Sequence, residues 1–317
     1  MQPTPLSRRQ FVSGISAISL AAVASGSTDA EGTADTGHTG TRIGLALGSG
    51  GANGLAHVLM LEALEEEGVR PHRISGSSIG AVIGALYAGG MSTADIRQLI
   101  DDFFISEGDN PIERLLSDDA MRLAELIEVD LGSGGILTSE RLVSRIYEKF
   151  KGNQFEQLDI PLSIVAADLW SREQLVLDSG DLLPAVQASM AIPGVFQPVE
   201  HRGKVLVDGG TVNPVPFDLF GDDCDLVIGI DVSGIRTKPE DSVPGYFETL
   251  FNSVKVMQRA VIEEKMKRVK PDIFIKPEIV DIRALEFYRA EEVYRQAQPA
   301  KEELKKALRK ALGQNSK

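Results

Sequence analysis

A serine between two glycines is the first candidate for chemistry in this sequence. Gly76-x-Ser78-x-Gly80 follows residues 71–74, which can form a short strand, and precedes residues 79–88, whose small and apolar side chains predict a helix. A serine on a tight strand-to-helix turn is held in a strained backbone conformation with its hydroxyl presented outward. The helix amino-terminus behind it favours negative charge. Ser78 is therefore a candidate nucleophile, although short patterns of this kind also occur in plain surface turns.

A glycine-rich loop precedes the serine. Residues 42–47 predict a buried strand and residues 55–67 an amphipathic helix. The loop between them contains Gly48, Gly50, Gly51, Ala52, Asn53 and Gly54. Its backbone N–H groups can bind an anion because they lead into a helix amino-terminus.

Three interpretations of this loop are open. A pyrophosphate site is one, because Gly48-x-Gly50-x-x-x-Gly54 is close to the dinucleotide-binding fingerprint, but the acidic residue expected after the next strand is absent. A turn that only allows close packing is another. The favoured interpretation is an oxyanion hole made by the N–H groups of Gly50 and Gly51, because Ser78 follows on the next turn.

A serine nucleophile needs a base, and the best placed candidate is an aspartate. Asp208 ends a predicted strand and is followed by Gly209 and Gly210, and active-site groups of open α/β sheets gather at strand ends. The chain's histidines, none in a recognisable catalytic context, are His38, His57, His72 and His201. An ordinary aspartate is a weak base, so a Ser/Asp pair would depend on the oxyanion hole for much of its rate.

The surrounding elements predict an α/β fold with a mainly parallel sheet. Further strands are expected at residues 160–168, 173–177, 204–208, 226–232 and 272–276, and further helices at 94–104, 110–129, 138–151 and 247–269. A last amphipathic helix is expected to be interrupted at Pro299, with its Glu and Lys runs on a solvated face. Residues 91–137 either cover one face of the sheet or line a substrate entrance.

The composition argues against several classes of protein and of site. The net charge of −13 argues against a nucleic-acid-binding protein, which needs a basic surface. The single cysteine, Cys224, excludes an internal disulfide and a thiolate metal cluster, and the four histidines lack metal-ligand spacing. No metal or cofactor is expected. The sequence contains no run of 18 apolar residues, so we expect no membrane-spanning helix.

The amino-terminal sequence predicts an export signal. Ser7-Arg8-Arg9-Gln10-Phe11, a weakly apolar stretch and Ala22-Val23-Ala24 form the pattern of a twin-arginine export signal. We expect residues 1–24 to be this signal, 25–41 a disordered linker, 42–280 a catalytic domain and 281–317 a helical extension packed on it. The mature protein would then be exported, to the periplasm or the cell exterior.

Together these blocks resemble the patatin-like phospholipases, of the bacterial subgroup with short chains. The glycine loop, the Gly76-x-Ser78-x-Gly80 turn and Asp208-Gly209-Gly210 match in order, and Ala188-Ser189-x-x-x-Pro193 and Asn213-Pro214-x-Pro216 also fit. The resemblance covers about residues 42–232. It implies a three-layer α/β/α fold, a Ser/Asp dyad, and hydrolysis of phospholipid or another long-chain acyl ester, with peripheral membrane contact. The family usually has Arg or Lys where this chain has Asn53, which puts a preference for anionic phospholipid in doubt.

The leading hypothesis is an exported lipid acyl hydrolase of phospholipase A or lysophospholipase type. Ser78 would attack the ester, Asp208 would take the proton, and Gly50 and Gly51, with Ala52, would hold the oxyanion. Two alternatives are a carboxylesterase for short soluble esters and a non-catalytic lipid-binding protein of the same fold.

Overall fold

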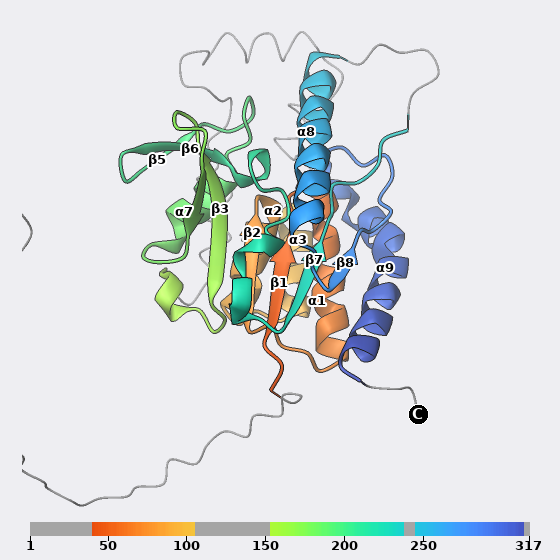
Figure 1. The fold of residues 1–317 in the computed structure, drawn as a ribbon. Coiled ribbons are helices and arrows are strands. Elements are labelled where there is room, and N and C mark those ends of the chain that lie inside the picture. The colour runs from red at the N-terminus through yellow and green to blue at the C-terminus, as the bar shows by residue number, and fades with distance from the viewer. Residues whose placement is uncertain (1–39, 105–152, 238–244, 314–317) are drawn as a thin grey trace, which may run out of the picture. The chain divides into compact units, whose positions relative to one another are not determined.

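One mixed β-sheet organises the chain (Figure 1). The structure is a computed structural model that describes residues 40–104, 153–237 and 245–313. The strands are β1 (Ile43–Leu47), β2 (Arg73–Ser77), β3 (Leu162–Asp168), β4 (Gln174–Leu177), β5 (Val199–His201), β6 (Lys204–Asp208), β7 (Leu226–Ile230) and β8 (Ile273–Ile275). Strands β3, β2, β1, β7 and β8 run parallel in that order, and β4, β5 and β6 add antiparallel pairs on the β3 side.

Helices cover both faces of this sheet. The helices are α1 (Ala56–Glu66), α2 (Ile79–Ala88), α3 (Thr93–Phe104), α7 (Leu182–Ser189), α8 (Tyr246–Arg268) and α9 (Ala290–Ala311). On β1, Leu45 and Leu47 join the core formed with α1, α2 and α9. Ala46 points the other way, into a smaller cluster with Phe217 and with Ile262 of α8. The alternation of side chains along a strand thus builds two cores and three layers, which confirms the predicted α/β/α fold class.

The strand register explains how residues 130 positions apart meet. Strand β3 has two edges, and β4 occupies one of them along residues 164–167. Strands β2 and β6 therefore share the other edge, one after the other: Ser77 lies opposite Val165, and Asp208 lies opposite Ala166. Since β2 is parallel and β6 antiparallel to β3, their carboxyl ends meet head to head. We refer to this meeting point of Ser78 and Asp208 as the strand junction.

Most predicted elements are present, with small shifts. The strand before Ser78 is β2, which begins at Arg73 and runs to Ser77, so the turn glycine Gly76 lies inside a strand. The prediction that the last helix breaks at Pro299 is wrong, because α9 runs through it. The export signal, most of the linker and the helices expected at 110–151 lie outside the described residues.

The charged residues of α9 lie mainly at the surface, as expected from the sequence, and some of its basic residues also bind α1. Lys301 binds Glu62 and Glu66 of α1 at 2.9 and 2.7 Å, and Arg309 binds Glu67 at 2.6 Å. The side chain of Lys301 is only 9% exposed. These ion pairs, with the apolar packing between the two helices, fasten α9 to α1. Across the described ranges, no helix is both long enough and apolar enough to cross a membrane.

Candidate active site

Ser78 sits on a strained turn at the strand junction. It has φ 57° and ψ −126°, a conformation that is unfavourable for residues other than glycine, and it immediately precedes α2. Both flanking glycines are required by backbone contacts: a Cβ on Gly80 would lie 2.1 Å from the carbonyl oxygen of Leu47, and one on Gly76 would lie 2.6 Å from that of Gly80. The tight packing holds the serine in its unusual conformation.

A second serine supports this turn. The buried Ser189 at the end of α7 accepts the N–H of Ser78 through Oγ at 2.8 Å and donates to the carbonyl oxygen of Val165 at 2.7 Å. Ser189 belongs to a block that fits the patatin-like pattern, but the sequence alone assigns it no role. Only the folded chain shows it, because α7 reaches the turn from 111 residues away.

Asp208 is the partner of Ser78. The hydroxyl of Ser78 donates to Oδ2 of Asp208 at 2.5 Å, and both residues are 5% exposed. The other carboxylate oxygen, Oδ1, accepts the N–H of Gly210 at 2.7 Å, which fixes the carboxylate plane. Gly209 allows the chain to pass over β3, because a Cβ there would lie 2.1 Å from the carbonyl oxygen of Val165.

Burial makes Asp208 a stronger base than an ordinary aspartate. Desolvation raises the pKa of Asp208 to about 6, against the opposing effect of hydrogen bonds from Ser78 and the N–H of Gly210. A base with a pKa near the working pH can both accept and return a proton. With its raised pKa, Asp208 is a stronger base than the sequence alone suggested.

The predicted anion-binding loop packs against the Ser78 turn. A Cβ on Gly54 would overlap the side chain of Ile79, and Gly80 also approaches the carbonyl oxygen of Gly48. Among the described residues, no hydrogen bond occupies the N–H groups of Gly50 and Gly51. Gly51 has φ 61°, which few other residues adopt.

Two members of the loop differ from the sequence-based expectation. The N–H of Ala52 donates to the carbonyl oxygen of Ala284 at 2.7 Å, so it is not free to bind an oxyanion. Asn53 is buried, and its Nδ2 donates to the carbonyl oxygen of Ser233 at 3.4 Å. Asn53 therefore ties the loop to the segment that follows β7.

The described histidines are not partners of Ser78. His57 is fully buried, and its Nε2 lies 2.8 Å from the carbonyl oxygen of Gly48. Burial lowers the pKa of His57 to about 4, which keeps the ring neutral. His72 is exposed and His201 lies in the β5–β6 hairpin, and neither shares a hydrogen bond with Ser78. His38 lies outside the described residues.

Helix α8 supplies a residue that sequence reasoning missed. Nε2 of Gln258 lies 3.2 Å from Oγ of Ser49 and 3.1 Å from the carbonyl oxygen of Gly210. It therefore joins the glycine loop to the segment that orients Asp208. No local pattern in the sequence marks a glutamine in the middle of a long helix for this contact.

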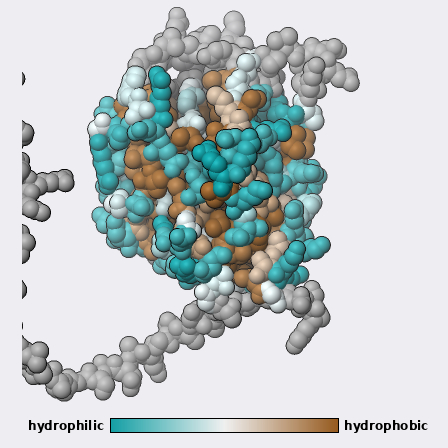
Figure 2. All heavy atoms as spheres, viewed as in Figure 1, coloured by the Kyte–Doolittle hydropathy of each residue, from teal (hydrophilic) through white to brown (hydrophobic). Residues whose placement is uncertain are grey.

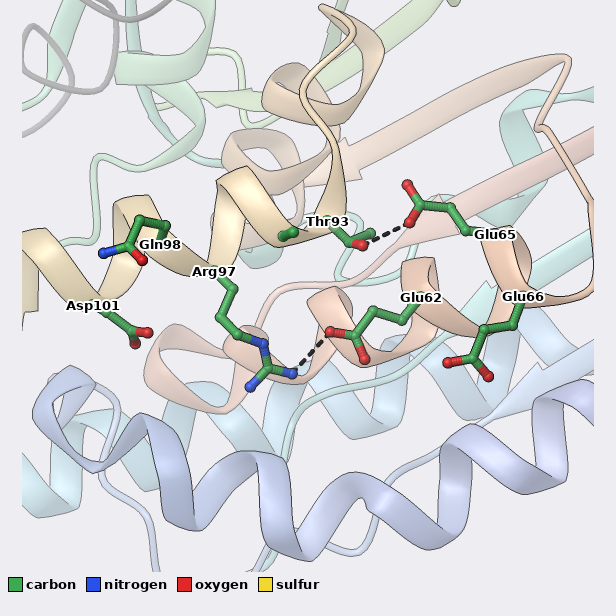
Figure 3. Close-up of a pocket in the computed structure, with 8 residues that line it drawn as sticks. Glu62, Glu65, Glu66, Thr93, Arg97, Gln98 and Asp101 are labelled. Carbon is green, nitrogen blue, oxygen red and sulfur yellow. Dashed lines mark hydrogen bonds and ion pairs between the residues drawn. The ribbon is translucent and has the colours of Figure 1, made fainter.

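A separate pocket between α1 and α3 contains neither member of the pair (Figure 3). Its lining includes Arg97, which binds Glu62 at 2.8 Å, and Thr93, which donates to Glu65 at 2.6 Å. These contacts join α1 to α3 and have a structural explanation. The Ser78–Asp208 pair at the strand junction is therefore a better candidate for catalysis than the residues of this pocket.

The family model for patatin-like phospholipases matches residues 45–220, more than half of the chain. The chain belongs to the patatin-like phospholipase family. The match includes the glycine loop, Ser78 and Asp208.

Sequence relatives include longer proteins. An uncharacterized NTE family protein of Mycobacterium tuberculosis is 34% identical over 204 residues, which are 64% of this chain and 52% of that protein. The lysophospholipase NTE1 of Saccharomyces cerevisiae is 26% identical over 280 residues, 81% of this chain and 16% of that protein. The chain thus spans about half of the mycobacterial relative and a small part of the yeast one.

Similar solved structures are distant. VipD from Legionella pneumophila has a TM-score of 0.45 at 15% identity, over 83% of this chain and 67% of that one. Human GIVD cytosolic phospholipase A2 has a TM-score of 0.42 at 13% identity, over 87% and 60%.

Proposed function

We propose that this patatin-like protein is a lipid acyl hydrolase with a Ser78/Asp208 dyad. The observation that carries the proposal is the 2.5 Å hydrogen bond from Oγ of Ser78 to Oδ2 of the buried Asp208. Family membership supports ester hydrolysis, and a relative named as a lysophospholipase supports a lipid substrate of phospholipase A or lysophospholipase type.

In the first half of the reaction, Oγ of Ser78 attacks the ester carbonyl carbon as its proton passes to Oδ2 of Asp208. The carbonyl oxygen becomes an oxyanion, for which Gly50 and Gly51 supply N–H groups and α2 supplies a favourable dipole. When the bond from carbon to the leaving oxygen breaks, Asp208 returns the proton to that oxygen. An alcohol leaves, and the acyl group stays on Ser78.

In the second half, Asp208 takes a proton from water, and the resulting hydroxide attacks the acyl carbon. The bond to Ser78 breaks, the proton returns to Oγ, and the fatty acid leaves. The raised pKa of Asp208 suits both transfers. The hydrogen bond from the N–H of Gly210 keeps the carboxylate aimed at Ser78 throughout.

The test is covalent labelling followed by turnover. A fluorophosphonate should label the wild type at Ser78 and should not label Ser78→Ala. Fatty-acid release from phospholipid and lysophospholipid should be lost in Ser78→Ala and Asp208→Asn, with normal circular dichroism. Retained release in Ser78→Ala would refute the proposal. A preference for short soluble esters in a chain-length series would favour the carboxylesterase instead.

We also propose the predicted domain layout and export through the twin-arginine signal. Arg8 and Arg9 before a weakly apolar stretch support the export proposal. Replacing both arginines by lysine should leave the protein inside the cell, and an unchanged distribution would refute the proposal.

A further inference from the structure

The hairpin between β3 and β4 presents apolar side chains to solvent. Leu169 is 42% exposed and Trp170 is 77% exposed, and both lie in residues 169–172, which we call the hairpin tip. A large apolar side chain that stays exposed to water does not contribute the stabilisation that its burial would provide. On the face drawn in Figure 2, hydrophobic and hydrophilic residues are interspersed.

The tip is rigid. Asp168, 6% exposed at its base, accepts the N–H of Trp170 through Oδ1 at 3.2 Å and binds Lys204 through Oδ2 at 2.8 Å. The backbone closes the turn with bonds from Arg172 N to Asp168 O and from Asp168 N to Glu173 O, and Leu169 N donates to Val205 O on β6. The apolar side chains are therefore held outward by a built turn.

The tip also lies at the edge of the sheet where Ser78 lies. The strand junction is opposite Val165 and Ala166, and β3 continues past it to Asp168. Leu169 lies three residue steps beyond Ala166, which is about 10 Å at 3.3 Å per strand residue. The tip thus extends about 10 Å beyond the level of Ser78.

The charges around the tip balance. The positive charges of exposed Arg172 and half-exposed Lys204 balance the negative charges of Asp168, which binds Lys204, and exposed Glu173. A neutral tip with one tryptophan and one leucine suits a zwitterionic lipid surface, where tryptophan rings rest at the level of the headgroups. The net charge of −13 disfavours a strongly anionic membrane.

We propose that Leu169 and Trp170 dock the protein on a zwitterionic phospholipid bilayer and so bring Ser78 to its substrate. This inference rests on the proposed lipid hydrolase function. It assigns the membrane contact to one rigid hairpin whose tip enters the headgroup region while the strand junction stays about 10 Å behind it.

The experiment uses the only tryptophan of the chain. In Ser78→Ala, which leaves the lipid intact, added phosphatidylcholine vesicles should shift the emission of Trp170 to shorter wavelength, and lipids brominated near the headgroup should quench it. Leu169→Ser should weaken vesicle binding about tenfold or more. Val269→Ser is the matched control. Val269 is 48% exposed but precedes β8, at the opposite edge of the parallel sheet. Its replacement should leave vesicle binding unchanged.

The outcomes separate this proposal from the hydrolase proposal. In Trp170→Ala, the rate of hydrolysis of vesicle lipid should fall about tenfold, and the rate on a short soluble ester should be unchanged. No emission shift, or equal binding by Leu169→Ser and wild type, overturns the docking proposal even if Ser78 is active. A shift that depends on protein concentration without vesicles would instead assign the tip to a second copy of the chain. Vesicle binding without any ester turnover would support docking and refute the hydrolase.

Discussion

Replacing Asp208 by asparagine should abolish activity and make the protein more stable. Burial raises the pKa of Asp208 to about 6, from an ordinary value of 3.8. The native state therefore binds this proton more tightly than the unfolded chain does. Between pH 3.8 and 6 the contribution of Asp208 to stability falls as pH rises, and above pH 6 the full cost of its buried charge is present.

The size of this cost follows from the pKa difference. The pKa is raised by about 2 pH units, and each unit corresponds to about 1.4 kcal/mol, so the ionised carboxylate costs about 3 kcal/mol above pH 6. Asparagine has the same shape and no charge. Its amide oxygen can accept the N–H of Gly210, and its amide nitrogen can donate to Oγ of Ser78. After the cost of burying the amide, we expect a gain of about 1–3 kcal/mol at pH 8.

Urea unfolding of wild type and Asp208→Asn between pH 4 and 8 measures this gain. The difference in unfolding free energy should be constant above pH 6 and should fall by about 2–3 kcal/mol as the pH is lowered to 4. Asp231→Asn is the control. Asp231 is equally buried but binds Lys276 at 2.8 Å, so its loss should destabilise the protein at pH 8. A pH-independent difference, or a less stable Asp208→Asn at pH 8, would refute the reasoning.

Further outcomes test the dyad and its supports. The rate kcat/KM of the wild type should fall about tenfold per pH unit below pH 6, because protonated Asp208 cannot accept the proton of Ser78; a flat profile down to pH 4.5 would exclude it as base. Ser78→Gly should be about 1 kcal/mol more stable than Ser78→Ala in urea unfolding, because glycine relieves the strain at φ 57°; equal stability would mean that the turn is not strained. Ser189→Ala should lower the unfolding free energy by about 1–3 kcal/mol and reduce kcat, since it leaves the N–H of Ser78 without an acceptor; unchanged kcat would remove its positioning role. Gly209→Ala should fail to fold or lose most of its activity, because its Cβ would overlap the carbonyl oxygen of Val165; normal thermal unfolding would show that the segment can shift.

The sequence predicted the elements better than their contacts. Apolar strands, capped helices and the Gly-x-Ser-x-Gly turn are local patterns, so β1, α1, α2 and β6 appear where they were expected. The nearness of Ser78 and Asp208 could be suspected from strand ends, but the register that makes β2 and β6 meet on one edge of β3 is a property of the whole sheet.

Contacts from distant segments could not be predicted. Gln258 reaches the glycine loop from α8, and the carbonyl oxygen of Ala284 takes the N–H of Ala52 that the sequence assigned to the oxyanion. The ion pairs from α9 to α1 could not be predicted either, because the sequence pattern does not show which surface the charges meet. Each of these contacts joins residues more than 200 positions apart.

The contact between Ala52 and Ala284 sets an order of events during synthesis. The glycine loop is among the first described segments to leave the ribosome, and its clamp, together with the α9 side chains that hold α1, is among the last. A nascent chain therefore carries Ser78 without the Ala284 contact on its glycine loop until residue 284 has been made. Stalled chains that end before residue 284 are expected to react with a fluorophosphonate more slowly than chains that include α9.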